Sequence, residues 1–206
     1  MWCVSYWERR KPVQRARAVD VEAVARAAVE LLDGGGLRAL TLRAAASRLD
    51  VAPASLYSRV DTVDDLFDLA LDHALGDDAV LGQALDTADL DGLMLAYYRH
   101  LVAHPWACQV IAMRPPRGPH YLRLSEAICV LLVDAGDPRP LATAYALSNF
   151  AIGSATTAAA ANDEHTSEVP VNIAPVYARL HREADVGEAE ATFVAGITQL
   201  RGRKGH

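Results

Sequence analysis

Apolar residues recur at helical spacing from residue 21 onward, and the first stretch predicts an amphipathic helix. Its apolar face consists of Val21, Val24, Ala25, Ala28, Leu31 and Leu32. The sequence DGGG at residues 33–36 ends this helix, because aspartate and glycine tolerate a positive φ.

Two shorter helices are predicted next. Thr41 stands at an N-cap position before a helix of about two turns. After a break at Asp50 and Val51, residues 52–57 form another brief helix with Pro53 in its first turn. Two short helices joined by a tight turn have the geometry of a helix-turn-helix.

The rest of the chain also shows helical patterns. Thr62 caps a fourth helix, whose predicted buried face is Val63, Leu66, Phe67, Ala70 and Ala74. Further helices are expected over residues 90–104, 105–113, 120–134, 138–161, 173–182 and 188–201, with proline- and glycine-rich breaks at 114–119 and 136–140. The absence of any alternating strand pattern favours an all-α fold.

The distribution of charge along the chain is more informative than the net charge. The net charge is −6, yet residues 1–63 carry ten Lys and Arg against seven Asp and Glu, whereas residues 64–206 carry ten against 19. Attraction to phosphate is local and is screened beyond roughly 10 Å. A basic front and an acidic remainder therefore predict a small DNA-binding module joined to a larger module that does not bind DNA.

We accordingly expect three segments: a basic N-terminal arm (1–18), a helix-turn-helix DNA-binding domain (19–63) and a helical ligand-sensing and dimerisation domain (64–206). The arm either reaches into a DNA groove, or is a disordered extension or an incorrect start. Its aromatic residues Trp2, Tyr6 and Trp7 have no obvious apolar partners, and its basic residues are Arg9, Arg10, Lys11, Arg15 and Arg17.

Several classes of function find no support. The charged start and the lack of a long apolar run lead us to expect a soluble, cytoplasmic protein without a membrane partner. The cysteines are too widely spaced for a zinc site, and His100 and His104 lack a third ligand nearby, so we expect no metal. No nucleophile, metalloprotease or phosphate-binding motif is present, which predicts that the protein is not an enzyme and uses no cofactor.

The sequence LTLRAAASRLDVAPASLYSRV at residues 40–60 resembles the DNA-binding signature of the tetracycline-repressor (TetR) family, and the resemblance extends over residues 24–36 and 64–66. It implies a homodimeric repressor with a larger helical domain, released from an inverted-repeat operator by a small-molecule ligand. It also implies a miniature core beneath the recognition helix, formed by Leu42, Ala46, Leu49, Val51 and Leu56.

The same resemblance assigns roles to exposed residues. Thr41 and Arg43 would bind one DNA phosphate and Tyr57 another. The side chains expected to face the major groove are Ala52, Pro53, Ala54 and Ser55, with Ser58 and Arg59 beside them.

This chain departs from the family pattern at the turn between the two short helices and just before the fourth helix. Asp50 stands where glycine is usual, and we expect it to adopt the left-handed conformation that aspartate tolerates. Val63 stands where lysine is common, and Asp61 adds a negative charge nearby. We expect Arg59 or the basic arm to compensate for the missing phosphate contact.

For the C-terminal region, the resemblance implies a dimer made by the last two long helices. The apolar face expected there consists of Ala144, Ala151, Ala155, Ala159, Phe193, Gly196, Ile197 and Leu200; the alternative is that these residues serve only the intrachain core. The candidate ligand pocket consists of Tyr97, Tyr98, Trp106, Met113, Tyr121, Asn149 and Phe150, each of which could instead fill the core.

Two other functions stay open, a small α-helical enzyme and a helical adaptor without a nucleic-acid role. The missing catalytic constellation argues against the first and the charge division against the second. In the repressor mechanism, two recognition helices enter successive major grooves about 34–36 Å apart, and the ligand changes that spacing.

Overall fold

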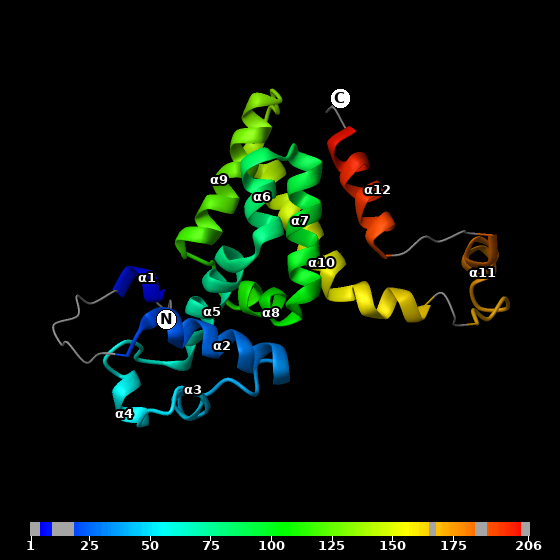
Figure 1. The fold of residues 1–206 in the computed structure, drawn as a ribbon. Helices are drawn as coiled ribbons and strands as arrows, with labels where there is room; N and C mark the ends of the chain where they lie inside the picture. Colours follow the sequence, from blue (N-terminus) through cyan, green and yellow to red (C-terminus); the bar gives the residue numbers. More distant parts are fainter. Residues whose placement is uncertain (1–4, 10–18, 165–167, 184–188, 203–206) are drawn as a thin grey trace.

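A computed structural model describes residues 5–9, 19–164, 168–183 and 189–202, and every regular element in these ranges is a helix (Figure 1). The helices are α1 (Tyr6–Arg9), α2 (Val21–Gly35), α3 (Leu42–Arg48), α4 (Pro53–Leu56), α5 (Val63–Asp77), α6 (Ala79–Thr87), α7 (Leu90–Ala103), α8 (Pro105–Met113), α9 (Pro119–Asp134), α10 (Pro140–Glu164), α11 (Pro175–Glu183) and α12 (Ala189–Gly202). The predicted all-α fold is confirmed.

The N-terminal helices begin and end where the local sequence predicts. Thr41 Oγ1 accepts a hydrogen bond of 3.0 Å from the Ala44 N–H and caps α3. Gly36, with φ of 65°, ends α2 by donating its N–H to the Leu32 carbonyl at 2.8 Å. Short α6 was not predicted, although Asp78 caps it by accepting the N–H groups of Val80 and Leu81.

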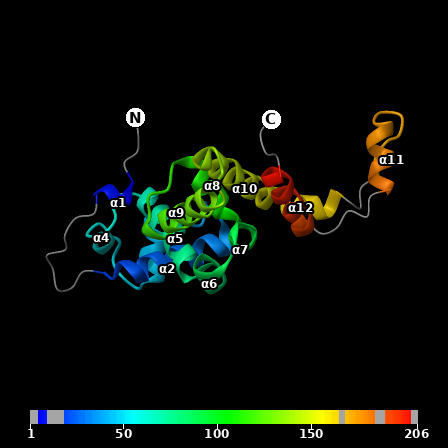
Figure 2. The same ribbon diagram turned by 90° about the horizontal axis from the view of Figure 1, so that it is seen from above.

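The larger set of helices packs around α7, which contacts α6, α8, α9, α10 and α12. A stack of aromatic rings joins three of these helices: Phe193 of α12 lies 4.3 Å from Tyr98 of α7 and 5.5 Å from Phe150 of α10, centroid to centroid. Both views place α11 away from this body, beyond the end of α10 (Figure 2). None of the described helices is long and apolar enough to cross a membrane.

Helix α5 connects the N-terminal helices to the larger set and buries a stripe of three carboxylates. Asp65, Asp68 and Asp72 are each at most 5% exposed, and their spacing of three and four residues places them on one helix face. Asp65 Oδ2 accepts the N–H groups of Asp61 at 2.8 Å and Thr62 at 3.0 Å, completing a capping box at the start of α5.

Asp68 binds two segments that lie far apart in the sequence. Its Oδ2 accepts the Tyr6 N–H at 2.9 Å and the Ser5 hydroxyl at 3.1 Å, and its Oδ1 accepts Arg114 Nε at 3.0 Å. Residues 5–9 therefore dock on α5, and the prediction that Tyr6 and Trp7 lack apolar partners is wrong: Tyr6 is buried and Trp7 packs against the core. Residues 1–4 and 10–18 of the predicted arm lie outside the described residues.

Asp72 anchors the start of α9. Its Oδ1 accepts the N–H groups of His120 at 2.9 Å and Tyr121 at 3.1 Å, and a carboxylate at a helix N-terminus is favoured by the helix dipole. The approach is so close that a Cβ on Gly118 would lie 2.0 Å from Asp72 Oδ1. Glycine at position 118 is therefore required for α9 to sit on α5.

We expect Gly118→Ala to lower the free energy of unfolding by about 1–3 kcal/mol, because the added methyl group forces Asp72 and α9 apart. The matched control is Gly82→Ala in α6, where a Cβ meets nothing within 4 Å; it should stabilise the protein by about 0.5–1 kcal/mol. Urea denaturation of both variants measures this, and equal stability of the two would contradict the proposed packing.

Candidate nucleic-acid interface

Helix α4 forms the outer edge of the N-terminal unit. Leu56 and Val60, at most 1% exposed, hold it to the core, while the side chains of Ala52, Pro53, Ala54 and Ser55 are exposed. In Figure 1, α3 and α4 lie at the edge of the molecule farthest from α9 and α12. The groove-facing surface expected from the sequence is thus accessible, and burial of Leu56 contributes roughly 1.5–3 kcal/mol to holding it in place.

The turn between α3 and α4 has the conformation expected of its sequence. Asp50 has φ of 52°, the one positive φ outside glycine among the described residues. Its N–H donates to the Ser47 carbonyl at 3.2 Å, and the Val51 N–H donates to the Ala46 carbonyl at 3.0 Å. The predicted miniature core is confirmed: Ala46 and Leu56 are fully buried, and three partly buried residues pack against them, Leu42, Leu49 and Val51.

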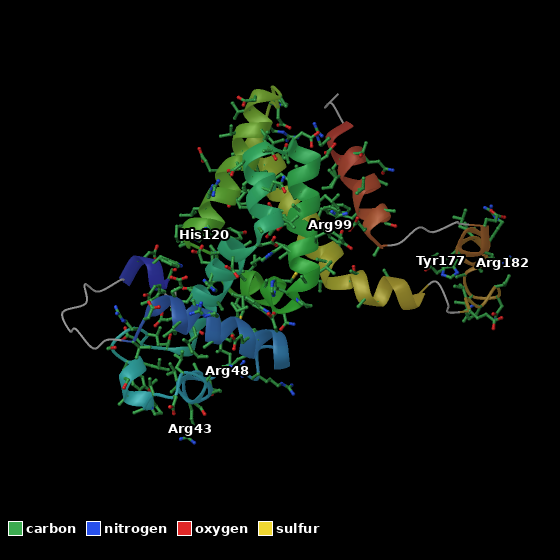
Figure 3. The ribbon with its side chains drawn as sticks, in the orientation of Figure 1. Arg43, Arg48, Arg99, His120, Tyr177 and Arg182 are labelled. Atoms are coloured by element: carbon green, nitrogen blue, oxygen red, sulfur yellow. The ribbon has the colours of Figure 1, made fainter. Side chains whose placement is uncertain are left out.

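The candidate phosphate-binding side chains surround α4. Arg43 is exposed at the start of α3 and extends outward, away from the other helices (Figure 3). The Tyr57 side chain is 57% exposed. Thr41 is exposed but its Oγ1 already accepts the Ala44 N–H, and the Ser58 hydroxyl donates to the Ser55 carbonyl at 2.7 Å. Arg43 and Tyr57 therefore present the most available polar groups.

Arg59 has a structural contact that the sequence did not indicate. It is half-buried, and its Nε donates to the Val19 carbonyl at 2.6 Å, which fastens the turn after α4 to the segment before α2. The expectation that Arg59 compensates for the missing lysine at Val63 is therefore weakened, because one face of its guanidinium is used inside the protein. Asp61 is exposed beside it.

The far end of α2 contacts the larger set of helices. Asp33 Oδ1 accepts Trp106 Nε1 at 2.6 Å and lies 2.7 Å from His104 Nδ1. Trp106 and His104 stand at the start of α8, so this carboxylate connects α2 directly to α8. The sequence suggested that Trp106 lines a ligand pocket. Its Nε1 atom donates to Asp33 of α2, 73 positions away, and a contact over that distance leaves no local sequence pattern.

His100 is buried and pairs with Asp78. Its Nδ1 lies 2.9 Å from Asp78 Oδ2, whereas its Nε2 is buried and has no hydrogen-bond partner. Burial lowers the pKa of His100 and outweighs the opposing effect of the Asp78 hydrogen bond. Across the described residues no group of three or more His, Cys, Asp or Glu side chains is placed to hold a metal ion.

The predicted pocket residues fall into separate groups. Tyr97 is buried beside Tyr121, and burial, followed by its interaction with Tyr121, raises the pKa of Tyr97. Tyr98 and Phe150 both belong to the ring stack on Phe193. Met113 and Asn149 are exposed. The aromatic core thus brings Tyr97 close to Tyr121, while Met113 and Asn149 lie at the surface.

Most residues of the predicted dimer face are buried inside the chain itself. These are Ala144, Ala151, Ala155, Phe193 and Ile197. For these five residues the alternative prediction, a role in the intrachain core, is confirmed. The large apolar side chains that α10 and α12 expose are Leu141, Tyr145, Val194 and Leu200.

Comparison with known proteins places the chain in a family. The family profile described as "Tetracyclin repressor-like, C-terminal domain" matches residues 86–184. An HTH-type transcriptional regulator of Saccharopolyspora erythraea is 34% identical over 194 residues, which cover 92% of this chain and 81% of that protein. The HTH-type transcriptional repressor DrrR1 of Streptomyces coeruleorubidus is 32% identical over 145 residues, covering 66% and 53% of the two chains.

Solved structures agree with this placement. The transcriptional regulator SCO7222, a TetR from Streptomyces coelicolor, superposes with a TM-score of 0.73 at 25% identity, covering 89% of this chain and 96% of that one. The TetR family protein ActR of Streptomyces coelicolor, in complex with actinorhodin, gives 0.71 at 22% identity over 91% and 95% of the chains, a likeness of fold.

This chain belongs to the tetracycline-repressor (TetR) family of helix-turn-helix transcriptional regulators. Its named relatives are regulators and not enzymes.

We expect the free energy of unfolding to fall as pH drops below about 6.5, the ordinary pKa of histidine. The lowered pKa of His100 means that the folded state favours neutral imidazole, so its contribution is present above that pH and is lost as pH falls through the folded-state pKa. Urea denaturation at about pH 7.5 and about pH 5.5 measures it in the native protein and in His100→Gln. An equal pH dependence of the two proteins would exclude His100 as the cause.

Proposed function

We propose that the protein is a homodimeric repressor that binds an inverted-repeat operator through α3 and α4 and releases it when a small molecule binds among α5–α10. The observation that carries this proposal is the exposed α4, held on the buried Leu56 with its outward side chains free to enter a major groove. The division into an N-terminal DNA-binding part (19–63) and a larger sensing part (64–206) belongs to the same proposal.

The proposed contacts to phosphates and the proposed contacts to bases use different chemistry. Arg43 and Tyr57 bind phosphates on either side of the groove, together with Thr41 and the backbone N–H groups at the start of α3. The groove-facing residues Ala52, Pro53 and Ala54 have no hydrogen-bonding side chains. Base recognition there rests on apolar contacts to thymine methyl groups and on DNA shape, with Ser55 and Ser58 as the polar members.

The exposed sides of α10 and α12 support the proposed dimer. Tyr145 is 64% exposed, Leu141 59% and Val194 42%, although monomers seldom expose large apolar patches. Ion pairs of Arg99 with Glu190 at 2.6 Å and of Arg201 with Asp91 at 2.6 Å hold one side of α12 to α7. The other side of α12 is left for a second copy.

The proposed ligand lies among the aromatic residues of the larger part. The neighbouring hydroxyls of Tyr97 and Tyr121 support this, because small-molecule sites combine apolar walls with a few polar groups. A ligand with a hydrogen-bonding group would find its polar partners there. Relatives add support for the direction of regulation, since DrrR1 is named a repressor.

Two contacts are suited to transmit ligand binding to α4. Arg114, in the segment between α8 and α9, binds Asp68 and Asp64 of α5, and Asp33 of α2 binds Trp106 of α8. A shift of α8 would therefore act on α2 and α5 at once. A change of the α4-to-α4 spacing in the dimer away from about 34–36 Å would weaken operator binding.

The experiment that tests the function is selection of duplex fragments from random DNA by the purified protein. An inverted repeat among the selected fragments, bound with an affinity that falls steeply with salt, is the expected result. Failure to select any sequence, together with salt-independent binding of duplex DNA, would refute the proposal.

We expect Arg43→Ala to weaken binding to all duplex sequences alike and to reduce the slope of log affinity against log salt by roughly one per subunit. The control Arg139→Ala removes the same charge from an exposed position between α9 and α10, remote from α4, and should leave the slope unchanged. Fluorescence anisotropy over a salt series measures both, and equal slopes would remove Arg43 from the interface.

We expect Tyr145→Glu to yield monomers and to lower operator affinity at least about a hundredfold, because a charge in an apolar interface is costly and a half-site contact is weak. Val80→Glu places the same charge at an equally exposed apolar residue of α6 (61% exposed) and should leave the dimer intact. Sedimentation equilibrium distinguishes the two; a dimeric Tyr145→Glu protein would exclude this face.

A further inference from the structure

Helix α1 docks on the joint between the two parts of the protein. It contacts α5, the helix that connects these parts, and lies beside the start of α9, where His120 stands (Figure 3). A helix of four residues is not stable by itself. Long-range contacts therefore hold it in place, among them the hydrogen bond from the Tyr6 N–H to Asp68, 62 positions away.

The local sequence is suited to form α1. Ser5 and Glu8 have the spacing of a capping box, and Glu8 Oε2 accepts the Ser5 N–H at 3.2 Å. The Glu8 N–H donates to the Ser5 carbonyl at 3.1 Å and closes the turn. The rings of Tyr6 and Trp7 meet edge to face, with 5.2 Å between their centroids. The segment therefore presents two adjacent aromatic rings to the core in a fixed geometry.

One buried carboxylate joins α1 to the segment between α8 and α9. Asp68 Oδ2 accepts the Tyr6 N–H and the Ser5 hydroxyl, while Asp68 Oδ1 accepts Arg114 Nε at 3.0 Å. The same guanidinium also pairs with Asp64 of α5 at 3.3 Å. Helix α1 and Arg114 thus use the two oxygens of one side chain, so a shift of either one acts on the other.

Trp7 fills the angle between α5 and this segment. Its side chain packs against the core and borders a gap that is too narrow to admit a water molecule. The other side chains at this gap include Leu71 of α5 and, from the segment before α9 and the first turn of α9, Pro116 and Tyr121. Because interiors packed at this density transmit strain, α5 and the start of α9 cannot rotate relative to each other without displacing the Trp7 ring.

We propose that Trp7 is a positioning residue for operator binding. It holds residues 114–121 against α5 and so fixes the orientation of the N-terminal unit relative to the larger set of helices. In a homodimer this orientation sets the distance between the two copies of α4, which must match successive major grooves. The effect on DNA rests on the repressor proposed above, whereas the clamping of α9 on α5 is a property of the single chain.

Amide hydrogen exchange of the full chain tests the clamp. The N–H groups of His120 and Tyr121 donate to Asp72 and report on the contact between α9 and α5. In Trp7→Ala we expect both amides to exchange at least about fivefold faster, because the start of α9 separates from α5 more often. The Val60 N–H, hydrogen-bonded within the N-terminal unit, should exchange at the native rate. Native exchange rates at His120 and Tyr121 would overturn the proposal.

Two further variants separate the role of the Trp7 ring from a general loss of stability. Trp7→Phe keeps an aromatic ring at the gap and should show a smaller increase in exchange; it becomes the test if circular dichroism shows that Trp7→Ala does not fold. Tyr177→Ala removes an aromatic ring from α11, which lies away from this joint (Figure 2), and should leave exchange at His120 and Tyr121 unchanged. Equal exchange in the Trp7→Phe and Tyr177→Ala proteins would contradict the clamp.

The effect on DNA is measured with the selected inverted repeat and with versions whose spacer is one base pair longer or shorter. One base pair moves the half-sites by about 3.4 Å, which the native protein should resist. We expect Trp7→Ala to lose at least about fivefold of the native preference for the selected spacing. Its affinity for a duplex with a single half-site should stay native, whereas a general loss of folded protein would lower both affinities and keep the preference.

Failure of this inference and failure of the repressor proposal give different results. If no inverted repeat is selected from random DNA, the repressor proposal fails, and exchange of the His120 and Tyr121 amides still decides whether Trp7 clamps α9 on α5. If Trp7→Ala binds the selected repeat with the native spacing preference, Trp7 is not a positioning residue for operator binding, although the repressor proposal stands.

Discussion

The buried carboxylates of α5 are the interactions on which the arrangement of this protein depends. Asp65, Asp68 and Asp72 lie on one face of the helix, and each accepts N–H groups from another segment: the turn before α5, the start of α1 and the start of α9. A buried carboxylate without such donors costs several kcal/mol. The three segments are therefore held where they satisfy α5. Two helices far apart in the sequence, α1 and α9, are positioned by a helix whose other buried residues are apolar.

Helix α5 contacts both parts of the protein: the turn after α4 at its start, and the larger set of helices along its later turns. Its start, capped by Thr62, follows directly from the turn after α4, and its later turns carry the contacts to Arg114 and α9. The Asp33 contact to Trp106 forms a second connection, at the far end of α2. Because packed interiors transmit strain, a small displacement of α8 or α9 would also displace α2 and α5. This is the physical basis on which a family of ligand-controlled DNA-binding proteins can work.

The distribution of charge separates three surfaces. The outer edge at α3 and α4 exposes Arg43 and hydroxyl groups, whereas carboxylates gather between α2, α5 and α9, and α10 and α12 expose apolar side chains. Because electrostatic effects are screened within roughly 10 Å, these carboxylates and the edge proposed to bind DNA can coexist in one small unit. A nucleic acid and a second copy of the chain would each meet a different chemistry.

The amino-acid sequence by itself determined the caps of α2, α3 and α5, the left-handed turn at Asp50 and the exposed α4, because these depend on neighbours within a few residues. Tertiary structure decided the docking of residues 5–9, the burial of Asp68 and Asp72, and the contact of Trp106 with Asp33, whose partners lie 46 to 73 positions away. It also decided which side of α10 faces inward, since alanines occur all around that helix and mark no single apolar face. Local hydrogen bonds leave a sequence pattern, whereas a buried acid that serves a distant N–H group leaves none.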